Sequence, residues 1–235
     1  MQLFYNPDIT ESDSSFTFSK DESRHITKVL RKSVGDILHI TNGKGWLFLA
    51  EIVIADHKNC SANITKSTYH KPKSYNLHLA VAPTKMNDRY EWFLEKATEI
   101  SVDSITPIIC QNSERKVIKK ERFEKIIQSA MKQSLQCHLP KLKDAISFKS
   151  FIDQTHEGQL FIAHCENTDR KSLKSQIKPK NDVTILIGPE GDFSTDEINT
   201  ALQKGFQPVT LGNTRFRTET AAIVACHSVT YSNHS

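Results

Sequence analysis

The sequence lacks the features of membrane-spanning and secreted proteins. No apolar run approaches the ~18 residues that a membrane-spanning helix needs. The first residues, MQLFYNPDITESDSS, are polar and acidic, whereas a secretory signal has basic residues followed by an apolar core. We therefore expect a cytoplasmic protein with no membrane-bound part.

The sequence also lacks the cysteine spacing of disulfide-bonded and zinc-binding domains. Its five cysteines are an odd number, lie far apart and form no CxxC pair. Three of them have a histidine beside them in the chain, which is not the ligand spacing of a tetrahedral zinc site. A chain of 235 residues can bury a sufficient core without cross-links, so we predict neither disulfides nor a metal.

Positive charge is present, and it is concentrated in one segment. The whole chain has a net charge of +4, of which residues 1–72 contribute +1. Residues 113–143 hold nine Lys and Arg against three Asp and Glu, a net +6. Such a segment suits a polyanionic partner. By charge alone, a solvated helix face with Lys–Glu pairs fits equally well.

Residues 1–72 have the pattern of a small β-barrel-like domain. Alternating or β-rich runs predict strands over 15–19, 37–41, 46–55 and 60–69. The Asn42–Gly45 stretch between two of these runs is a hairpin signal, and residues 21–30 have the spacing of a short amphipathic helix. The polar segment 70–74 contains a proline and is typical of a linker.

Residues 73–235 alternate between predicted strands and helices. The apolar runs predict strands over 77–82, 105–110, 160–163, 183–187 and 209–211. The helical periodicity predicts helices over 88–100, 121–135, 194–203 and 218–229. We expect Asp88 with Glu91, and Ser194 with Glu197, to cap two of these helices. This alternation predicts an α/β domain with a parallel sheet.

Two polar segments follow predicted strands of this sheet. The first is IGPEGDFS, from Ile187 to Ser194, and the second is LGNTRFRTETA, from Leu211 to Ala221. Ligands bind at the carboxyl ends of strands in open parallel sheets, so the two segments predict a ligand site. Neither is a GxGxxG or GxxxxGK[ST] nucleotide motif, and no GxSxG hydrolase motif occurs. A structural role is favoured over a nucleophilic one for Cys165, which follows a third strand.

These two segments carry a family resemblance. GPEGDFS followed by LGNTRFRTETAA resembles the paired C-terminal signature of the SPOUT methyltransferases, and in detail that of the RsmE family. The stretch LEKATEI at 94–100 is similar to a helical element of that family. The motifs at 113–115, 132–134 and 139–140 fall where the family has like motifs, and parts of 24–45 resemble its N-terminal PUA-like domain. The resemblance covers nearly the whole chain.

The resemblance implies a fold, a cofactor and a substrate. The fold is a SPOUT-type parallel sheet with a C-terminal trefoil knot at 73–235, preceded by a PUA-like RNA-binding β-barrel at 1–72. The cofactor is S-adenosyl-L-methionine, and the reaction is methylation of N3 of a uridine in 16S ribosomal RNA. The implied partners are this RNA, within the small ribosomal subunit, and a second copy of the chain in a homodimer.

The resemblance also implies roles for individual residues. The carried-over cofactor-binding residues are His164, Ile187, Gly188, Pro189, Glu190, Gly191, Leu211, Gly212, Arg215, Phe216, Arg217, Thr218, Thr220 and Ala221. The expected RNA-binding residues are Arg24, Lys28, Arg31, Lys85, Arg115, Lys119 and Lys120.

The expected catalytic residues are Arg217 and Glu219. Uridine N3 carries a proton at neutral pH, so it needs a base and a cation that stabilises the anion. Arg217 is assigned to the anion and Glu219 to the proton, while a capping role stays open for Glu219.

The sequence departs from the family pattern at three positions. Asp192 stands where the family often has glycine, and Gln136 stands where an arginine is expected. The position where the family often has an arginine is Thr214, with Arg215 one residue later. Whether Arg215 or Arg217 faces the substrate therefore stays open.

Two other functions compete with this one. The chain could be a SPOUT methyltransferase for another RNA nucleotide, because the cofactor motifs do not fix the base. It could also be a non-catalytic RNA-binding or assembly factor with the same fold. Calorimetry with S-adenosylmethionine separates the second alternative, since a binding module takes up no cofactor.

Overall fold

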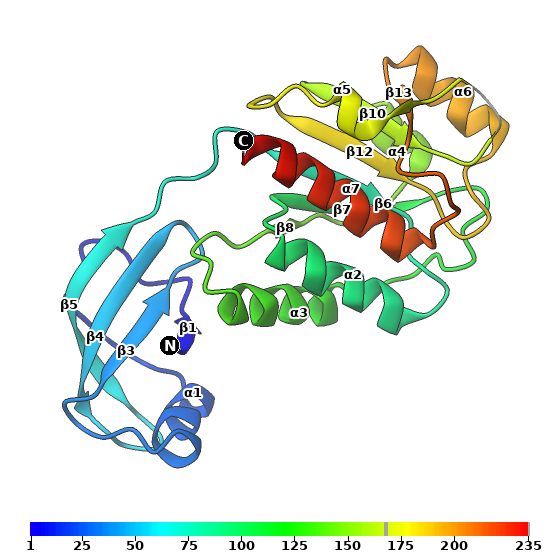
Figure 1. Cartoon of the computed structure of the whole chain (residues 1–235). Helices are drawn as coiled ribbons and strands as arrows, with labels where there is room; N and C mark the ends of the chain where they lie inside the picture. Colours follow the sequence, from blue (N-terminus) through cyan, green and yellow to red (C-terminus); the bar gives the residue numbers. More distant parts are fainter. Residues whose placement is uncertain (167–168, 235) are drawn as a thin grey trace. The chain divides into compact units, whose positions relative to one another are not determined.

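The structure is a computed structural model that describes residues 1–166 and 169–234, and it divides into two compact units (Figure 1). The first unit contains residues 1–72 together with 131–139, and the second contains the remainder of the chain. The sequence alone placed 131–139 in the second domain. This segment joins the first unit because Gly45 N donates to Cys137 O at 2.8 Å and Leu139 N donates to Gly43 O at 2.9 Å.

The first unit is built on one curved sheet. Its strand order is β1 (Leu3–Tyr5), β3 (Ile37–Thr41), β4 (Trp46–Ile54), β5 (Ser61–Tyr69) and β2 (Ser15–Thr17). Strands β3, β4 and β5 are antiparallel, and β1 is parallel to β3. The side chains of Phe4, Ile40 and Phe48 lie in its buried core. The hairpin predicted at Asn42–Gly45 is confirmed, with Gly43 and Gly45 both at positive φ.

The helix predicted over 21–30 is interrupted. Helix α1 (Lys20–Arg24) continues into the π-helical turn η1 (His25–Val29), in which Leu30 N donates to His25 O at 3.0 Å. Arg31 follows at a φ of 55°. A π-helical turn inserts one extra residue and is frequent at functional sites. Hydrophobic spacing does not reveal such a turn.

The second unit contains a parallel sheet, as predicted. Its strand order over the described residues is β11 (Lys171–Ser172), β13 (Gln207–Thr210), β10 (Gln159–Ala163), β12 (Val183–Ile187), β6 (Leu77–Val81), β7 (Ser104–Ile109) and β8 (Lys141–Leu142). A further strand, β9 (Ile146–Ser147), pairs with β7. All of these pairings are parallel. Strands β8, β9 and β11 are only two residues long, so no periodicity could predict them.

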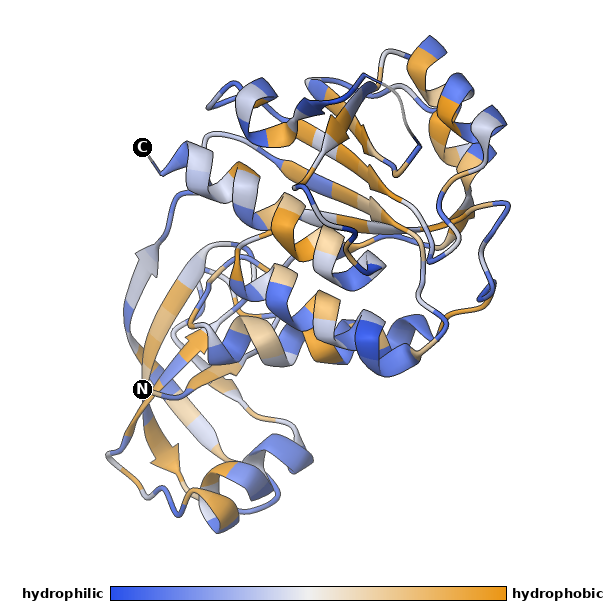
Figure 2. Cartoon of the chain, turned by 45° about the vertical axis from the view of Figure 1, so that its right-hand side comes forward, coloured by the Kyte–Doolittle hydropathy of each residue, from blue (hydrophilic) through white to orange (hydrophobic). Residues whose placement is uncertain are grey.

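Helices cover both faces of this sheet (Figure 1). Helices α2 (Asn87–Glu99) and α7 (Thr218–Asn233) pack together on one face, where α7 contacts β6 and β12. The aromatic ring of Phe123 in α3 (Lys120–Gln133) lies 5.2 Å from that of Tyr90 in α2. Helices α4 (Phe148–Ile152) and α6 (Thr195–Gln203) pack on the other face, and the short helix α5 (Leu173–Gln176) contacts α7. Apolar residues follow the strands and the helix faces turned toward them (Figure 2).

The two capping predictions have different outcomes. The capping box of α6 is confirmed, because Ser194 and Glu197 each accept a hydrogen bond from the other's backbone N–H. The one predicted for α2 is wrong. Met86 precedes that helix without a side-chain cap, and Asp88 lies inside its first turn, where the carboxylate accepts from Arg89 N. The trefoil knot stays a prediction. In the described part of the chain, no helix is long and apolar enough to cross a membrane.

Candidate active site

Three neighbouring strands bring the two polar segments together. Strand β10 lies between β12 and β13, and all three run parallel, so Ala163, Ile187 and Thr210 end at the same edge of the sheet. The segments that follow them are 164–165, 188–194 and 211–217. Their convergence is the arrangement that the sequence predicted for a ligand site.

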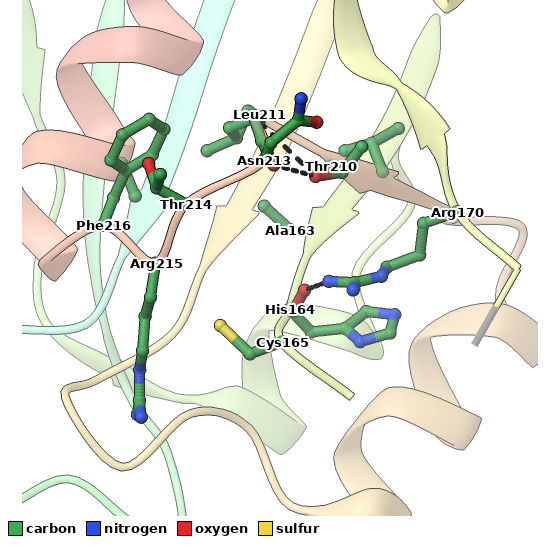
Figure 3. A pocket seen from close by; sticks show the side chains of 13 residues that line it. Ala163, His164, Cys165, Arg170, Thr210, Leu211, Asn213, Thr214, Arg215 and Phe216 are labelled. Carbon is green, nitrogen blue, oxygen red and sulfur yellow. Dashed lines mark hydrogen bonds between the residues drawn. The ribbon is translucent and has the colours of Figure 1, made fainter. Parts of the chain in front are cut away.

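Two adjoining cavities lie at this edge. One, of about 400 Å³, lies between the end of β10 and the loop 210–216 (Figure 3). The other, of about 310 Å³, lies between the GPEG loop and residues 215–218. Both are lined by Ala163, Cys165, Arg215, Phe216 and Ala221.

Most of the residues assigned to the cofactor line one of these cavities. The first cavity has His164, Leu211 and Gly212, the second has Ile187, Gly188, Pro189, Glu190, Arg217 and Thr218, and both have Arg215, Phe216 and Ala221. Two assigned residues line neither. Gly191 faces Asn112, and Thr220 lines a neighbouring cavity between α2 and α7. Arg170 also lines the first cavity and was not predicted from the sequence, because it is remote from the motifs; Asn213 lies within the predicted segment from Leu211 to Ala221 but was given no role of its own.

His164 is a buried polar side chain at the cavity wall. It is 5% exposed, and neither of its ring nitrogens has a hydrogen-bond partner among the described residues. Burial, and then the nearby charge of Arg170, lower the pKa of this histidine, so the ring is neutral at pH 7. The Arg170 guanidinium donates to the carbonyl of His164 (Figure 3). A neutral imidazole left without partners can donate or accept one hydrogen bond to a ligand.

The backbone conformation at Asp192 explains why the family often has a glycine at this position. Its φ is 62°, a left-handed conformation that glycine adopts without strain and that aspartate tolerates better than most residues. Its carboxylate accepts from Cys165 N at 2.6 Å and from Phe193 N at 2.9 Å. Asp192 therefore ties the GPEG loop to the end of β10. Burial and this carboxylate raise the pKa of the Cys165 thiol, so the structure gives no support to a thiolate nucleophile.

The GPEG loop is held mainly through its backbone and Glu190. Lys85 N donates to the Glu190 carboxylate at 2.9 Å, and the hydroxyl of Thr218 donates to Gly188 O at 3.1 Å. A Cβ atom added to Gly188 would lie 3.0 Å from the Phe193 ring, so a side chain there would require this ring to shift by a few tenths of an ångström. The Glu190 carboxylate, which sequence analysis assigned to the cofactor, is thus engaged in fixing the loop.

Arg217 and Glu219 lie at the beginning of α7. Arg217 is exposed and precedes the helix without a side-chain cap. Glu219 is 6% exposed, and its Oε1 lies 3.9 Å from Arg89 Nε. Arg215 lines both strand-end cavities, and its guanidinium lies 3.5 Å from Glu190 O. The two arginines are therefore both at the site, in different surroundings.

The residues assigned to RNA belong to both units. Arg24, Lys28 and Arg31 are exposed on the first unit. In the second unit, Lys119 is exposed, Lys85 pairs with Glu114 at 2.8 Å, and Lys120 pairs with Asp144 at 2.6 Å. The Arg115 guanidinium donates to the carbonyls of Thr84 and Lys85, so only part of it is open to a phosphate. Within residues 1–166 and 169–234, no group of three or more His, Cys, Asp or Glu is arranged to hold a metal.

Comparison with known proteins gives consistent matches. Residues 71–230 match the family model of an RNA methyltransferase domain, and residues 18–65 match that of an RNA methyltransferase PUA domain. The ribosomal RNA small subunit methyltransferase E of Buchnera aphidicola is 32% identical over 90% of this chain and 86% of its own length.

Solved structures resemble the chain over nearly its full length. A crystal structure described as a "probable rRNA-methyltransferase" from Porphyromonas gingivalis has a TM-score of 0.92 and 42% identity, covering 100% of this chain and 99% of that one. The ribosomal RNA small subunit methyltransferase E of Neisseria gonorrhoeae, bound to S-adenosyl methionine, has a TM-score of 0.86 and 25% identity, covering 96% of this chain and 95% of its own.

Proposed function

The chain belongs to the ribosomal RNA small subunit methyltransferase E family, and from this premise we propose that it methylates N3 of a specific uridine in 16S ribosomal RNA. The methyl donor is S-adenosyl-L-methionine. The observation that carries the proposal is the pair of adjoining cavities formed by the GPEG and LGNTRFRTET segments at neighbouring strand ends.

The residues of these cavities fit S-adenosylmethionine. This ligand has an adenine, a ribose and a charged amino-acid end, so it needs both donors and acceptors. The neutral ring of His164 and the Nε of Arg170 are buried and have no partner in the part of the chain that the structure describes. The loop 211–213 and the backbone of Gly188–Gly191 supply further N–H and C=O groups. These residues would hold the cofactor.

The chemistry divides between the cofactor and the chain. When bound, S-adenosylmethionine supplies a methyl group on a positively charged sulfur that leaves as a neutral thioether. The protein holds the uridine so that its N3 and this methyl group are aligned, which can contribute on the order of 7–11 kcal/mol. Glu219 would accept the N3 proton, which would leave the electron pair of N3 free for the methyl group that the cofactor supplies. Arg217 stabilises the negative charge that develops on the uracil oxygens.

Binding of the RNA is divided between two regions. We assign RNA binding to residues 1–72, where Arg24, Lys28 and Arg31 would contact phosphates. The catalytic domain is 73–235, where Lys85, Arg115, Lys119 and Lys120 would contact phosphates beside the site. We further propose that the chain acts as a homodimer in the cytoplasm, on the small ribosomal subunit.

The deciding experiment is mass spectrometry of 16S ribosomal RNA from cells that lack this protein. We expect loss of a single 3-methyluridine, restored by the wild-type gene and not by Arg217→Ala. Loss of a methyl group from another nucleotide would reassign the substrate. An unchanged RNA, together with no uptake of S-adenosylmethionine in calorimetry, would identify a non-catalytic RNA-binding protein instead.

A further inference from the structure

A third cavity lies between helices α2 and α7, and we name it the α2–α7 cavity. It has a volume of about 690 Å³ and is lined by Arg89, Trp92, Arg215, Phe216, Arg217 and Glu219 among other residues. The segment Arg215–Arg217 is shared with the GPEG cavity, so the two cavities meet along it. A volume of this size is in the range of small-molecule sites.

Glu219 leaves one hydrogen-bond acceptor unused at this cavity. Its side chain is 6% exposed, and Oε1 is 3.9 Å from Arg89 Nε, while Oε2 has no hydrogen-bond partner among residues 1–166 and 169–234. A buried carboxylate oxygen without a donor is costly, because it has lost its water and gained nothing in return. A ligand that brings an N–H group to Oε2 would remove this cost.

Trp92 offers an aromatic surface to the same cavity. It lies on α2, one turn after Arg89, and is 43% exposed, although an indole is among the largest apolar groups. Nucleobases taken out of an RNA strand commonly stack on such a ring, and one stacking contact is worth roughly 1–3 kcal/mol. An exposed indole and a buried carboxylate oxygen with no described donor line the same cavity, and a flat base with an acidic N–H can use both.

We propose that the α2–α7 cavity receives the acceptor base, with Trp92 as its stacking platform and Arg89 as the positioning residue that holds the Glu219 carboxylate. The proposal rests on the function proposed above and assigns the substrate end of the site. Glu219 Oε2 accepts the N3–H of uracil. Cytosine has a lone pair at N3 and no proton there. Its N3 and the Glu219 carboxylate would both be hydrogen-bond acceptors and would repel each other, so this contact selects uridine over cytidine.

Fluorescence of Trp92 tests the stacking contact directly. The chain has two tryptophans, so Trp46→Phe leaves Trp92 as the only indole emitter. With S-adenosylhomocysteine present, we expect oligouridylate to quench Trp92 emission saturably, and oligocytidylate of equal length to quench it less. Quenching that is absent, or equal for the two oligomers, would overturn the proposal. So would emission that changes with protein concentration and not with RNA, because a second copy would then cover Trp92.

Activity on ribosomal subunits from the deletion strain gives the second test. Trp92→Ala should lower kcat/KM for RNA by about 5- to 150-fold, the equivalent of one stacked base, and Trp92→Phe should restore most of it. The control Tyr231→Ala removes an exposed aromatic ring of α7 that does not line the cavity, and should have no effect. Affinity for S-adenosylmethionine in calorimetry should stay unchanged in all three variants.

The positioning role of Arg89 is tested by measuring whether its substitution changes kcat or the KM for RNA. Arg89→Gln should lower kcat with little change in the KM for RNA, and Arg89→Lys should recover part of the loss. If Arg89→Gln raised the KM for RNA and left kcat unchanged, Arg89 would be assigned to RNA binding, and its positioning role would be overturned. If wild-type protein methylated RNA while Trp92→Ala and Arg89→Gln were fully active, only this inference would fail. If wild-type protein neither bound S-adenosylmethionine nor methylated RNA, the proposed function would fail as well.

Discussion

Arg215 and Arg217 flank Phe216 in the loop before α7, and their surroundings separate their roles. Arg215 lines both strand-end cavities and also the α2–α7 cavity, and it approaches a backbone carbonyl of the GPEG loop. Arg217 lines the GPEG cavity and the α2–α7 cavity, where Glu219 lies. Of the two arginines, only Arg215 lines the cavity between β10 and the loop 210–216, so at the scale of single residues we propose Arg217 for the substrate and Arg215 for the cofactor.

Substitution of these two arginines should have different kinetic effects. Arg217→Ala should reduce kcat by ~10²–10³, the usual effect of removing one contact to a developing anion, and leave cofactor affinity intact. Arg215→Ala should weaken S-adenosylmethionine binding in calorimetry. Near-full turnover of Arg217→Ala with normal cofactor binding would show that this residue does not stabilise the uracil anion.

Asp192 allows the backbone and side-chain effects of one position to be separated. Asp192→Gly keeps the positive φ at no strain and loses only the contacts to Cys165 N and Phe193 N. Asp192→Ala loses the same contacts and adds a strained left-handed alanine, which costs about 1–2 kcal/mol. Urea denaturation should therefore find the alanine variant less stable than the glycine variant by about 1 kcal/mol. Equal stabilities would mean that the loop relaxes to another conformation.

Helix α6 shows what an element contributes to the site. It begins directly after the GPEG loop, and its capping box closes the helix end on that loop. Glu197 belongs to this box and also accepts from Gln111 N at 2.9 Å, which connects the loop after β7 to the same helix end. The Ser-x-x-Glu spacing predicted this cap from sequence, whereas the contact to Gln111 depends on the fold.

Loss of the α6 cap should destabilise the second unit. Ser194→Ala removes the acceptor for Glu197 N and should lower the free energy of unfolding by ~1 kcal/mol, measured in urea. Ser129→Ala, at an exposed position inside α3, is the matched control and should change stability by less than about 0.5 kcal/mol. A Ser194→Ala variant as stable as the control would show that the cap contributes little here.

At the scale of the whole molecule, charge is distributed over two structural units. Several cations of the segment 113–143 are engaged within the second unit, since Lys120 pairs with Asp144 and Arg122 pairs with Glu91. The net charge of this segment therefore overstates the number of cations available to RNA. We therefore expect the exposed basic residues of the first unit to supply further contacts to RNA phosphates.

Salt dependence of RNA affinity measures how many phosphates the protein contacts. The triple variant Arg24→Ala, Lys28→Ala, Arg31→Ala should reduce the slope of log affinity against log salt by about 2, since each phosphate contact contributes ~0.7 to 0.9. A matched triple variant of Lys58, Lys66 and Lys71, in the same unit, should leave the slope nearly unchanged. A flat salt response of the wild-type protein would contradict a broad phosphate-binding surface.

Stability should fall on acidification because the partly buried ring of His78 resists protonation in the folded chain. Burial, aided by the charges of Lys143 and His156, lowers the pKa of His78 to about 3. The unfolded chain binds this proton near pH 6.5 and the folded chain does not, so unfolding becomes easier as the pH falls below 6.5. Between pH 7 and 5, wild-type protein should lose about 2 kcal/mol more than His78→Gln. Equal losses in urea denaturation would show that His78 is not the titrating group.

The sequence by itself determined the alternation of strands and helices, the Asn42–Gly45 hairpin, the α6 cap and the two segments that form the site. These features depend on residues close together in the chain. Only the tertiary structure decided which groups meet at the site. Four features depend on strand order and burial: the ring of His164, which has no hydrogen-bond partner among residues 1–166 and 169–234, its neighbour Arg170, the role of Asp192 and the Arg89–Glu219 contact. Spacing along a chain does not encode these properties, because they arise when segments remote in sequence pack together and exclude water.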